Sequence, residues 1–217
     1  KHPLKPHLPA WSPGAHVDLR LEDGKIRQYS LTSDPQDLSR YAITVKREND
    51  GRGGSSWIHE YLIEGVVARV SAPRNNFVLS ETRSLLIAGG VGVTPLISIG
   101  RALNEKNLLY AFHFCSRRRQ SNVERDLKNF CDSTLSTYVS DEPKSPRLDL
   151  VALIGSLPRD LHIYCCGPKR LMAEVKELTN DWNPKQIHFE FFSTEIDENY
   201  KPEPFNVIIS STGQTLR

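Results

Sequence analysis

The stretch LLIAGGVGVTPLIS, residues 85–98, is an apolar run that is interrupted by Gly89, Gly90 and Gly92 and resumes after Thr94 and Pro95. A strand that ends in residues with so little side chain indicates that another group approaches its backbone closely. The pattern that follows, from residue 95 on, predicts a helix. A strand, a glycine-rich turn and a helix in succession leave backbone N–H groups free at a helix N-terminus, where a phosphate group fits.

By itself this motif leaves two interpretations open. The dinucleotide-binding fingerprint is G-x-G-x-x-G with an acidic residue about 20 positions later. Gly90 and Gly92 match it, but Pro95 stands at the third position and the next predicted strand ends in SRRRQ, residues 116–120. The alternative is a tight strand-to-helix turn that binds nothing.

The chain after residue 80 has the pattern of alternating strands and helices. Continuous apolar strands are predicted at 84–90, 108–115 and 162–167, a last strand at 188–192, and helices at 95–105 and 169–178. Strands that are apolar throughout and alternate with helices are typical of a parallel sheet covered on both faces. We therefore predict an α/β domain for this part.

Before residue 80 the strands are shorter and alternate in polarity. They are predicted at 16–21, 27–31, 41–48 and 68–73, separated by turn signals such as NDGRGG. This spacing favours a small antiparallel β-barrel or sandwich. One helix is predicted at 55–65, with serine as its N-cap and Gly65 as its stop.

A second anion site is predicted in this first part. On the strand RQYSL, Arg27 and Tyr29 share a face and Ser30 takes the neighbouring position. The turn GRGGSS, residues 51–56, opens the predicted helix, so Arg27 and the helix N-terminus can hold a phosphate together. The alternatives are that Arg27 and Tyr29 lie on a solvated strand face and that the glycine turn is an ordinary turn.

Composition limits the function classes. The 217 residues suffice for two modest domains, and 38% hydrophobic with 25% charged residues are typical of a globular protein. A net charge of +2 argues against nucleic-acid binding. No apolar run approaches the roughly 18 residues of a membrane span, and no signal peptide is recognised. We expect a cytoplasmic protein with four reduced cysteines, Cys115, Cys131, Cys165 and Cys166.

Taken in order, five segments resemble the ferredoxin-NADP reductase superfamily. They are PGAHVDL, RQYSL, VKRENDGRGGSSWIHE, IAGGVGVTP and YCCGP. More narrowly, the chain is similar to the phthalate dioxygenase reductase group, the reductase components of Rieske-type oxygenases. The resemblance implies an FMN-binding barrel at 1–80 that lacks its N-terminal strands and an NAD(P)-binding domain at 81–194. Residues 195–217 would be a linker and the start of a truncated or disordered [2Fe-2S] ferredoxin-like domain.

The resemblance also implies roles for individual residues. The FMN phosphate would be held by Arg27, Gly54, Ser55 and Ser56, with Tyr29 and Lys46 beside the flavin. Ser30, near flavin N5, and Cys166, over the nicotinamide, would be the catalytic positions. The dinucleotide would contact Gly89, Gly90, Gly92, Thr94, Gly167 and Pro168. No acid–base role is implied for His16, His59, His113 or His188, which we expect to be satisfied structural or surface residues.

Coenzyme preference is predicted from the end of the second strand of the nucleotide domain. An acidic residue there binds the ribose 2′-hydroxyl of NADH, whereas an arginine accepts a 2′-phosphate. Ser116 and Arg117, followed by two more arginines, favour NADPH over NADH. The alternatives are surface arginines on a loop, or a docking patch for an acidic electron-transfer partner.

The leading hypothesis is an NAD(P)H-dependent FMN reductase that passes single electrons through an iron–sulfur domain to an oxygenase. None of the four cysteines has the C-x4-C-x2-C spacing of a plant-type cluster, so the sequence is a fragment or the cluster domain is lost. A flavin reductase that serves a soluble acceptor directly is one alternative. A module that binds flavin or nucleotide without catalysis is the other.

Overall fold

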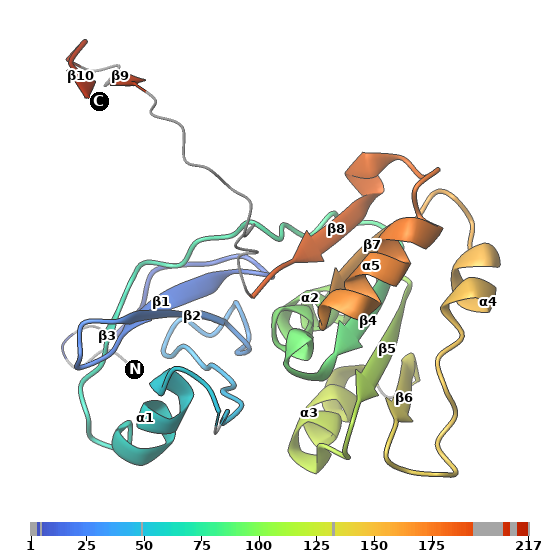
Figure 1. The fold of residues 1–217 in the computed structure, drawn as a ribbon, viewed down its shortest axis with the longest axis horizontal. Helices are drawn as coiled ribbons and strands as arrows, with labels where there is room; N and C mark the ends of the chain where they lie inside the picture. The colour runs from blue at the N-terminus through green and yellow to red at the C-terminus, as the bar shows by residue number, and fades with distance from the viewer. Residues whose placement is uncertain are drawn as a thin grey trace.

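The computed structural model describes residues 4, 6–48, 50–131, 133–192, 206–208 and 212–216. They form two lobes, one built on a three-stranded antiparallel sheet and the other on a five-stranded parallel sheet (Figure 1). The predicted combination of an antiparallel β domain with an α/β domain is confirmed. None of the helices in these ranges is long and apolar enough to cross a membrane.

The first lobe packs one helix against its sheet. Its elements are β1 (His16–Arg20), β2 (Ile26–Ser30), β3 (Arg69–Val70) and α1 (Gly54–Tyr61). The strand order is β2-β1-β3 and both pairings are antiparallel. Alternation along β1 buries Leu19, which forms a small core with Leu21 and with Ile58 of α1.

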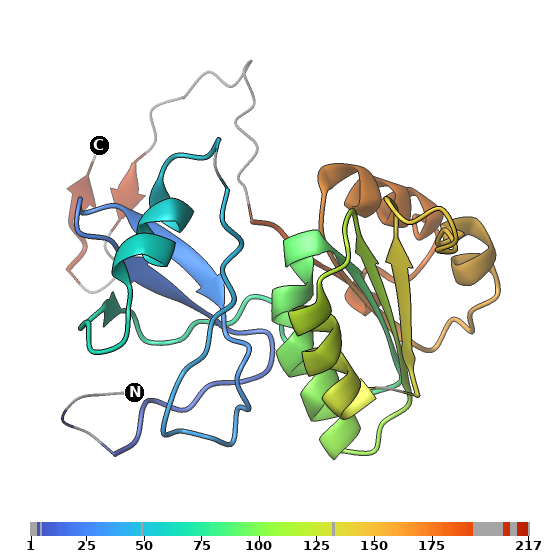
Figure 2. The same cartoon turned by 90° about the horizontal axis from the view of Figure 1, so that it is seen from below.

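The second lobe has helices on both faces of its sheet (Figure 2). Its strands, in the order β6-β5-β4-β7-β8, are β6 (Leu135–Val139), β5 (Tyr110–Ser116), β4 (Ser84–Gly89), β7 (His162–Cys166) and β8 (Ile187–Glu190). Its helices are α2 (Val93–Glu105), α3 (Ser121–Cys131), α4 (Leu150–Gly155) and α5 (Lys169–Leu178).

The central strand β4 is buried on both faces. Leu86 and Ala88 belong to the core shared with α2 and α3, whereas Leu85 and Ile87 belong to the core shared with α4 and α5. This two-sided burial is the reason that the strand reads as one continuous apolar run. The run ends where the chain leaves the sheet at Gly89.

Several sequence predictions are corrected. Residues 41–48 form no strand, and their one ladder contact is the bridge between Leu31 and Ile43. Helix α1 ends at Tyr61 rather than at 65. Its N-cap is Gly53 and not a serine, because the Ser55 hydroxyl instead accepts the backbone N–H of Glu48 at 3.0 Å.

Helices α3 and α4 and strand β6 were not predicted from the sequence. Strand β6 lies at the edge of the sheet and is only partly buried, so LSTYV lacks the apolar run of an inner strand. Most of the predicted segment 195–217 lies outside the described residues. The described part of it forms a short antiparallel pair, β9 (Val207–Ile208) with β10 (Thr215–Leu216).

The two lobes are joined by specific contacts. The backbone N–H of Gly14 donates to Ser98 Oγ at 3.0 Å, and both atoms are buried. The Phe77 ring packs edge-on against Tyr164, with 5.4 Å between ring centroids. The Tyr164 hydroxyl also accepts the backbone N–H of Ser80 at 2.6 Å. These contacts hold the first lobe against α2 and β7.

Candidate active site

The glycine-rich turn directly follows β4, and its three glycines differ. Gly90 has a φ of 55°, and a Cβ added there would meet nothing within 4 Å. A Cβ at Gly89 would lie 2.5 Å from Pro168 Cδ, and one at Gly92 would lie 2.2 Å from the carbonyl oxygen of Cys166. The group that approaches Gly89 and Gly92 is therefore the turn after β7. Of the three, Gly90 alone leaves open space beside its backbone.

Two helices begin at this point without a side-chain cap. The N-cap of α2 is Gly92 and that of α5 is Pro168, and neither provides a side-chain hydrogen bond to the first turn. The first turn of α5 leaves backbone N–H groups for solvent or a ligand. At α2 the short 3-10 turn Gly90–Gly92 precedes the helix, and the Val93 N–H already bonds to the carbonyls of Gly90 and Val91. Both helix dipoles favour negative charge at this point. Because Gly167 packs on Gly89, the two N-termini converge at the carboxyl edge of the sheet, where open α/β proteins bind ligands.

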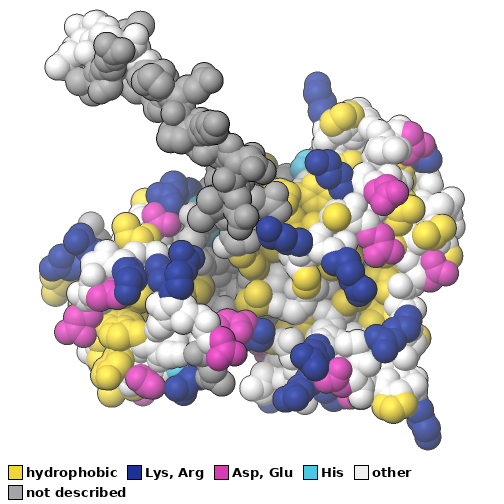
Figure 3. Space-filling view, in the orientation of Figure 1, with side chains coloured by type: hydrophobic (Ala, Val, Ile, Leu, Met, Phe, Trp, Pro, Cys, Tyr) yellow, Lys and Arg dark blue, Asp and Glu magenta, His cyan; other side chains and the backbone are white. Residues whose placement is uncertain are grey.

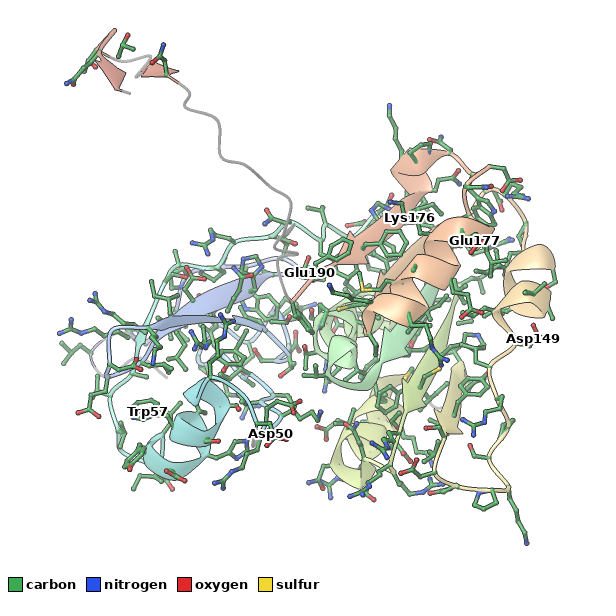
Figure 4. All side chains as sticks on the ribbon, viewed as in Figure 1. Asp50, Trp57, Asp149, Lys176, Glu177 and Glu190 are labelled. Atoms are coloured by element: carbon green, nitrogen blue, oxygen red, sulfur yellow. The ribbon has the colours of Figure 1, made fainter. Side chains whose placement is uncertain are left out.

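A cleft of about 1280 Å³ opens at this edge. It reaches the first lobe, which contributes Glu48 and Asp50 to its wall; Figure 4 labels Asp50 in the loop before α1. Six of the residues that the sequence predicts for cofactor binding line it, namely Lys46, Gly89, Gly90, Ser116, Arg117 and Pro168. Its size and its walls from both lobes suit a dinucleotide better than a small metabolite.

Not every predicted residue faces this cleft. Gly92 and Thr94 are buried, and the Thr94 hydroxyl donates to the Val91 carbonyl at 3.0 Å within its own turn. Contact between these two residues and the dinucleotide stays a prediction. Their observed role is to shape the turn and to bring α2 close to the Cys166 segment.

The second predicted anion site lies at the start of α1. Arg27 borders it, since a Cβ added to Gly54 would lie 2.7 Å from Arg27 Nε. Gly53, with a φ of 80°, leaves the first turn without a side-chain cap. The guanidinium donates to the Ile26 carbonyl at 2.9 Å and has no carboxylate partner among the described residues. A cation with spare donors beside free N–H groups fits the phosphate of a flavin nucleotide.

Tyr29 shares the face of Arg27, as predicted, and is half-buried against the core of the first lobe. Burial raises the pKa of its phenol, and the nearby charge of Arg27 lowers it by a smaller amount. Its ring is therefore a neutral flat surface next to the proposed phosphate site. A flavin ring system can stack on such a surface.

Three further predicted residues lie around this position. Lys46 Nζ is 2.5 Å from Glu48 Oε1, and the Ser55 hydroxyl ties Glu48 to α1. Ser56 follows in the first turn of the helix and is half-buried. The loop that bears Lys46 is thereby attached to the helix that bears the serines.

The two predicted catalytic residues are connected through a pair that the sequence did not indicate. Ser30 on β2 lies opposite His16 on β1, and Cys166 on β7 lies opposite Glu190 on β8. His16 Nδ1 is 3.9 Å from Glu190 Oε1, across the two lobes. Figure 4 labels Glu190 at the end of β8, between the lobes.

His16 differs from the satisfied histidine that we expected. Its side chain is 2% exposed, and neither ring nitrogen has a hydrogen-bond partner among the described residues. Burial lowers its pKa, Arg74 adds to that effect, and Asp18 opposes it. The ring is thus held neutral inside the protein, which leaves one nitrogen free to accept and one free to donate.

Glu190 and Cys166 also favour their neutral forms. Burial raises the pKa of Glu190 to about 7. Burial raises the pKa of the Cys166 thiol as well, and the charges of Glu190 and Cys165 add to it. A protonated thiol at this position is a small polarizable surface and not a nucleophile. The region around His16, Glu190 and Cys166 can therefore hold a proton but carries little fixed charge.

Comparisons with known proteins agree with this geometry. No protein-family model matches the chain. It is 34% identical over 220 residues to the phthalate 4,5-dioxygenase oxygenase reductase subunit of Pseudomonas putida, and the match covers 99% of this chain and 68% of the relative. The structure of phthalate dioxygenase reductase, described as modular for electron transfer from pyridine nucleotides to [2Fe-2S], superposes with a TM-score of 0.81 at 30% identity.

That superposition covers 99% of this chain and 68% of the solved one. A third relative is an intact type IV self-sufficient cytochrome P450 monooxygenase, with a TM-score of 0.86 and 34% identity, of which this chain covers 28%. The curated sequence and both structures agree along nearly the whole of the chain. The chain therefore belongs to the phthalate dioxygenase reductase family, the NAD(P)H-dependent flavin oxidoreductases of oxygenase systems.

Proposed function

We propose that the chain is the FMN- and NAD(P)H-binding part of an oxygenase reductase. FMN would be held by Arg27, Gly54 and the α1 N-terminus, and the dinucleotide by the cleft at Gly90 and Pro168. The observation that carries the proposal is the meeting of the two lobes at His16 and Glu190, 3.9 Å apart. Two separate anion sites on lobes that meet at one buried point suit two cofactors that must touch.

FMN is proposed because one compact phosphate site stands beside one aromatic face. Arg27 supplies the charge and Tyr29 the flat surface, both from β2. When bound, the flavin would accept a hydride from the coenzyme and release electrons one at a time. The protein contributes position, since hydride transfer requires the reacting atoms to approach to roughly 3–3.5 Å.

The residues around the meeting point have distinct tasks in this proposal. Ser30 is 4% exposed, so its hydroxyl is available to a flavin atom without competition from bulk water. Cys166, protonated and 1% exposed, supports the nicotinamide side of the contact. Glu190 and neutral His16, the ladder neighbours of Cys166 and Ser30, hold a proton beside them. They also keep fixed charge out of the region where the two lobes meet.

The electrons would leave through an iron–sulfur domain to an oxygenase. The support comes from relatives, since the phthalate relative is named as an oxygenase reductase subunit and the solved reductase as one that transfers electrons to [2Fe-2S]. No group of three or more His, Cys, Asp or Glu side chains in the described ranges is arranged to hold a metal. By likeness to that solved reductase, the cluster is proposed for a further domain of the full-length protein. The protein is proposed to be cytoplasmic, with its four cysteines reduced.

The test starts from the purified protein. Its flavin should be released by denaturation and identified by mass as FMN, and anaerobic addition of NADPH or NADH should bleach the flavin absorbance. Recovery of FAD would refute the FMN assignment. Binding of flavin without bleaching by either coenzyme would favour a non-catalytic module.

The electron acceptor that the protein uses distinguishes an oxygenase reductase from the remaining alternative, a flavin reductase. The full-length protein should contain iron and acid-labile sulfide and should reduce a one-electron acceptor such as cytochrome c. A full-length protein that lacks iron but passes hydride to free flavin would be a flavin reductase instead.

A further inference from the structure

A second cavity shares only Pro168 with the coenzyme cleft. It has a volume of about 560 Å³, and its wall is formed by one face of α5, by Phe189 of β8 and by Phe191 and Phe192 just after that strand. Sites for small molecules span roughly 300–1,000 Å³ and are mostly apolar with a few polar groups. The cavity has these properties, and the proposed function assigns nothing to it.

This cavity lies on the opposite face of the sheet from the point where the lobes meet. Phe189 packs on the core shared with α4 and α5, whereas Cys166 belongs to the core shared with α2 and α3. Phe191 follows Phe189 on the same side, with 6.2 Å between the ring centroids. Glu190, between them, approaches His16 of the first lobe instead. The cavity is therefore separate from the proposed contact of flavin and nicotinamide.

The wall of the cavity is apolar and rich in aromatic rings. Met172 is buried in it, whereas Phe191 and Phe192 are 63% and 50% exposed. Single exposed apolar side chains are common, but adjacent large ones that border a cavity are typical of a binding surface. Their rings can stack on another ring or meet it edge-on. Figure 3 shows hydrophobic side chains beside Lys and Arg side chains on this part of the second lobe.

The charged groups of the cavity are all positive. Lys169 and Lys176 line it from the same face of α5, and none of the described residues that line it is acidic. Lys176, labelled in Figure 4, is exposed and forms no side-chain hydrogen bond or ion pair with the part of the chain that the structure describes. A lysine ammonium beside an apolar wall can pair with a carboxylate whose remaining atoms are apolar.

We propose that this cavity binds a small aromatic carboxylate. Its ring packs against Phe189, Phe191 and Met172, and its carboxylate pairs with Lys176. A flat ring suits this wall better than a flexible chain because it loses less conformational freedom on binding. The inference goes beyond the proposed function and does not depend on it, since the cavity contains none of the residues assigned to the flavin.

Binding of 2-naphthoate to the flavin-loaded full-length protein, followed by ligand-observed NMR, tests the proposal. We expect one site per chain with a Kd on the order of 1 mM or lower. The neutral analogue 2-naphthamide should bind about tenfold or more weakly, because it lacks the charge that pairs with lysine. Octanoate should bind at least about threefold more weakly than 2-naphthoate. Octanoate that binds as tightly would overturn the aromatic class.

Two variants locate the bound molecule. Lys176→Gln should weaken 2-naphthoate about tenfold and leave 2-naphthamide unchanged, whereas Phe191→Ser should weaken both. Lys185→Gln, at an exposed lysine outside the cavity, should change neither affinity. The same affinities should be found with saturating NADP⁺, because the coenzyme cleft is a separate site. None of these measurements requires turnover, so they stand whether or not the protein oxidises NAD(P)H.

Three results would overturn the proposal. One is the absence of 2-naphthoate binding at about 10 mM, far above the expected Kd. Another is complete displacement of 2-naphthoate by NADP⁺, which would place it in the coenzyme cleft. The third is a wild-type dimer that Phe191→Ser converts to a monomer while neither protein binds 2-naphthoate, which would assign this surface to a second copy of the chain.

Discussion

His16 Nδ1 and Glu190 Oε1 lie 3.9 Å apart although the two residues belong to different lobes. Each is the ladder neighbour of one predicted catalytic residue, His16 of Ser30 and Glu190 of Cys166. The contact therefore lies between the flavin side and the nicotinamide side of the proposed site. It includes a carboxyl group whose pKa burial raises to about 7.

The first prediction concerns pH. Because burial raises the pKa of Glu190 from 4.5 to about 7, folding favours its protonated form. That contribution to stability is present below pH 4.5 and is lost as the pH rises through about 7. Glu190→Gln keeps a neutral side chain at every pH, so between pH 5 and 8 the wild type should lose about 2.5 kcal/mol relative to the variant, or roughly 5–10 °C in Tm.

Differential scanning calorimetry across this range measures the effect. His16 is present in both proteins, so its own titration cancels in the comparison. Glu177→Gln, on the exposed face of α5 (Figure 4), should run parallel to the wild type. If Glu190→Gln also runs parallel, the Glu190 carboxyl is ionised throughout and the contact is an ordinary ion pair.

The second prediction concerns the flavin phosphate. Arg27→Ala removes a charge-assisted contact of about 1.5–3 kcal/mol, so the Kd for FMN should rise roughly 10- to 150-fold. Flavin fluorescence on titration measures it. Arg20→Ala, an exposed arginine on β1, is the matched control and should retain full affinity. Unchanged affinity in Arg27→Ala would move the phosphate away from the α1 N-terminus.

The third prediction concerns the glycine turn. In Gly92→Ala the new Cβ would lie 2.2 Å from the Cys166 carbonyl oxygen, and backbone cannot move aside cheaply, so we expect a loss of about 3 kcal/mol or more in the free energy of unfolding. Gly155→Ala meets no atom within 4 Å and should be neutral or add up to about 1 kcal/mol. Urea denaturation compares the two. Equal stabilities would show that the turns at 89–92 and 166–168 are not packed as described.

The fourth prediction separates the adjacent cysteines. Cys165 and Cys166 are both fully buried, but they point into different cores. Alanine at either position should cost a similar amount of stability, roughly 1–3 kcal/mol. In stopped-flow experiments Cys166→Ala alone should slow flavin reduction, by about tenfold, equivalent to ~1.4 kcal/mol of barrier. An equal slowing in Cys165→Ala would remove the case for a specific role of Cys166.

The inner strands of the second lobe were predictable because a strand buried on both faces is apolar at nearly every position. Strand β4 and helix α5 fall where their apolar patterns place them, the helix at the predicted bounds of 169–178. The edge strand β6 and the segment 41–48 have no such apolar run, because the polarity pattern of half-exposed residues is compatible with a strand, a helix or a loop. Helix α1 ends at Tyr61 because Leu62 leaves the helical conformation, four residues before the backbone reaches Gly65.

The site was predictable where local motifs define it and not where distant segments meet. The shared face of Arg27 and Tyr29 follows from the two-residue repeat of a strand. The contact between His16 and Glu190 joins β1 to β8 and has no local signal. The buried histidine at the start of β1 becomes informative only because neither of its ring nitrogens has a hydrogen-bond partner among the described residues.

Anaerobic rapid mixing of the purified flavoprotein with reduced coenzyme follows the hydride transfer itself. If the two lobes bring flavin and nicotinamide together where His16 meets Glu190, the flavin absorbance should bleach in a first-order phase that saturates with NADPH concentration. The phase should be slowed in Cys166→Ala, and its amplitude should fall in Arg27→Ala in proportion to the flavin that this variant loses. A wild-type protein that is loaded with flavin and binds coenzyme, yet shows no bleaching, would contradict the account.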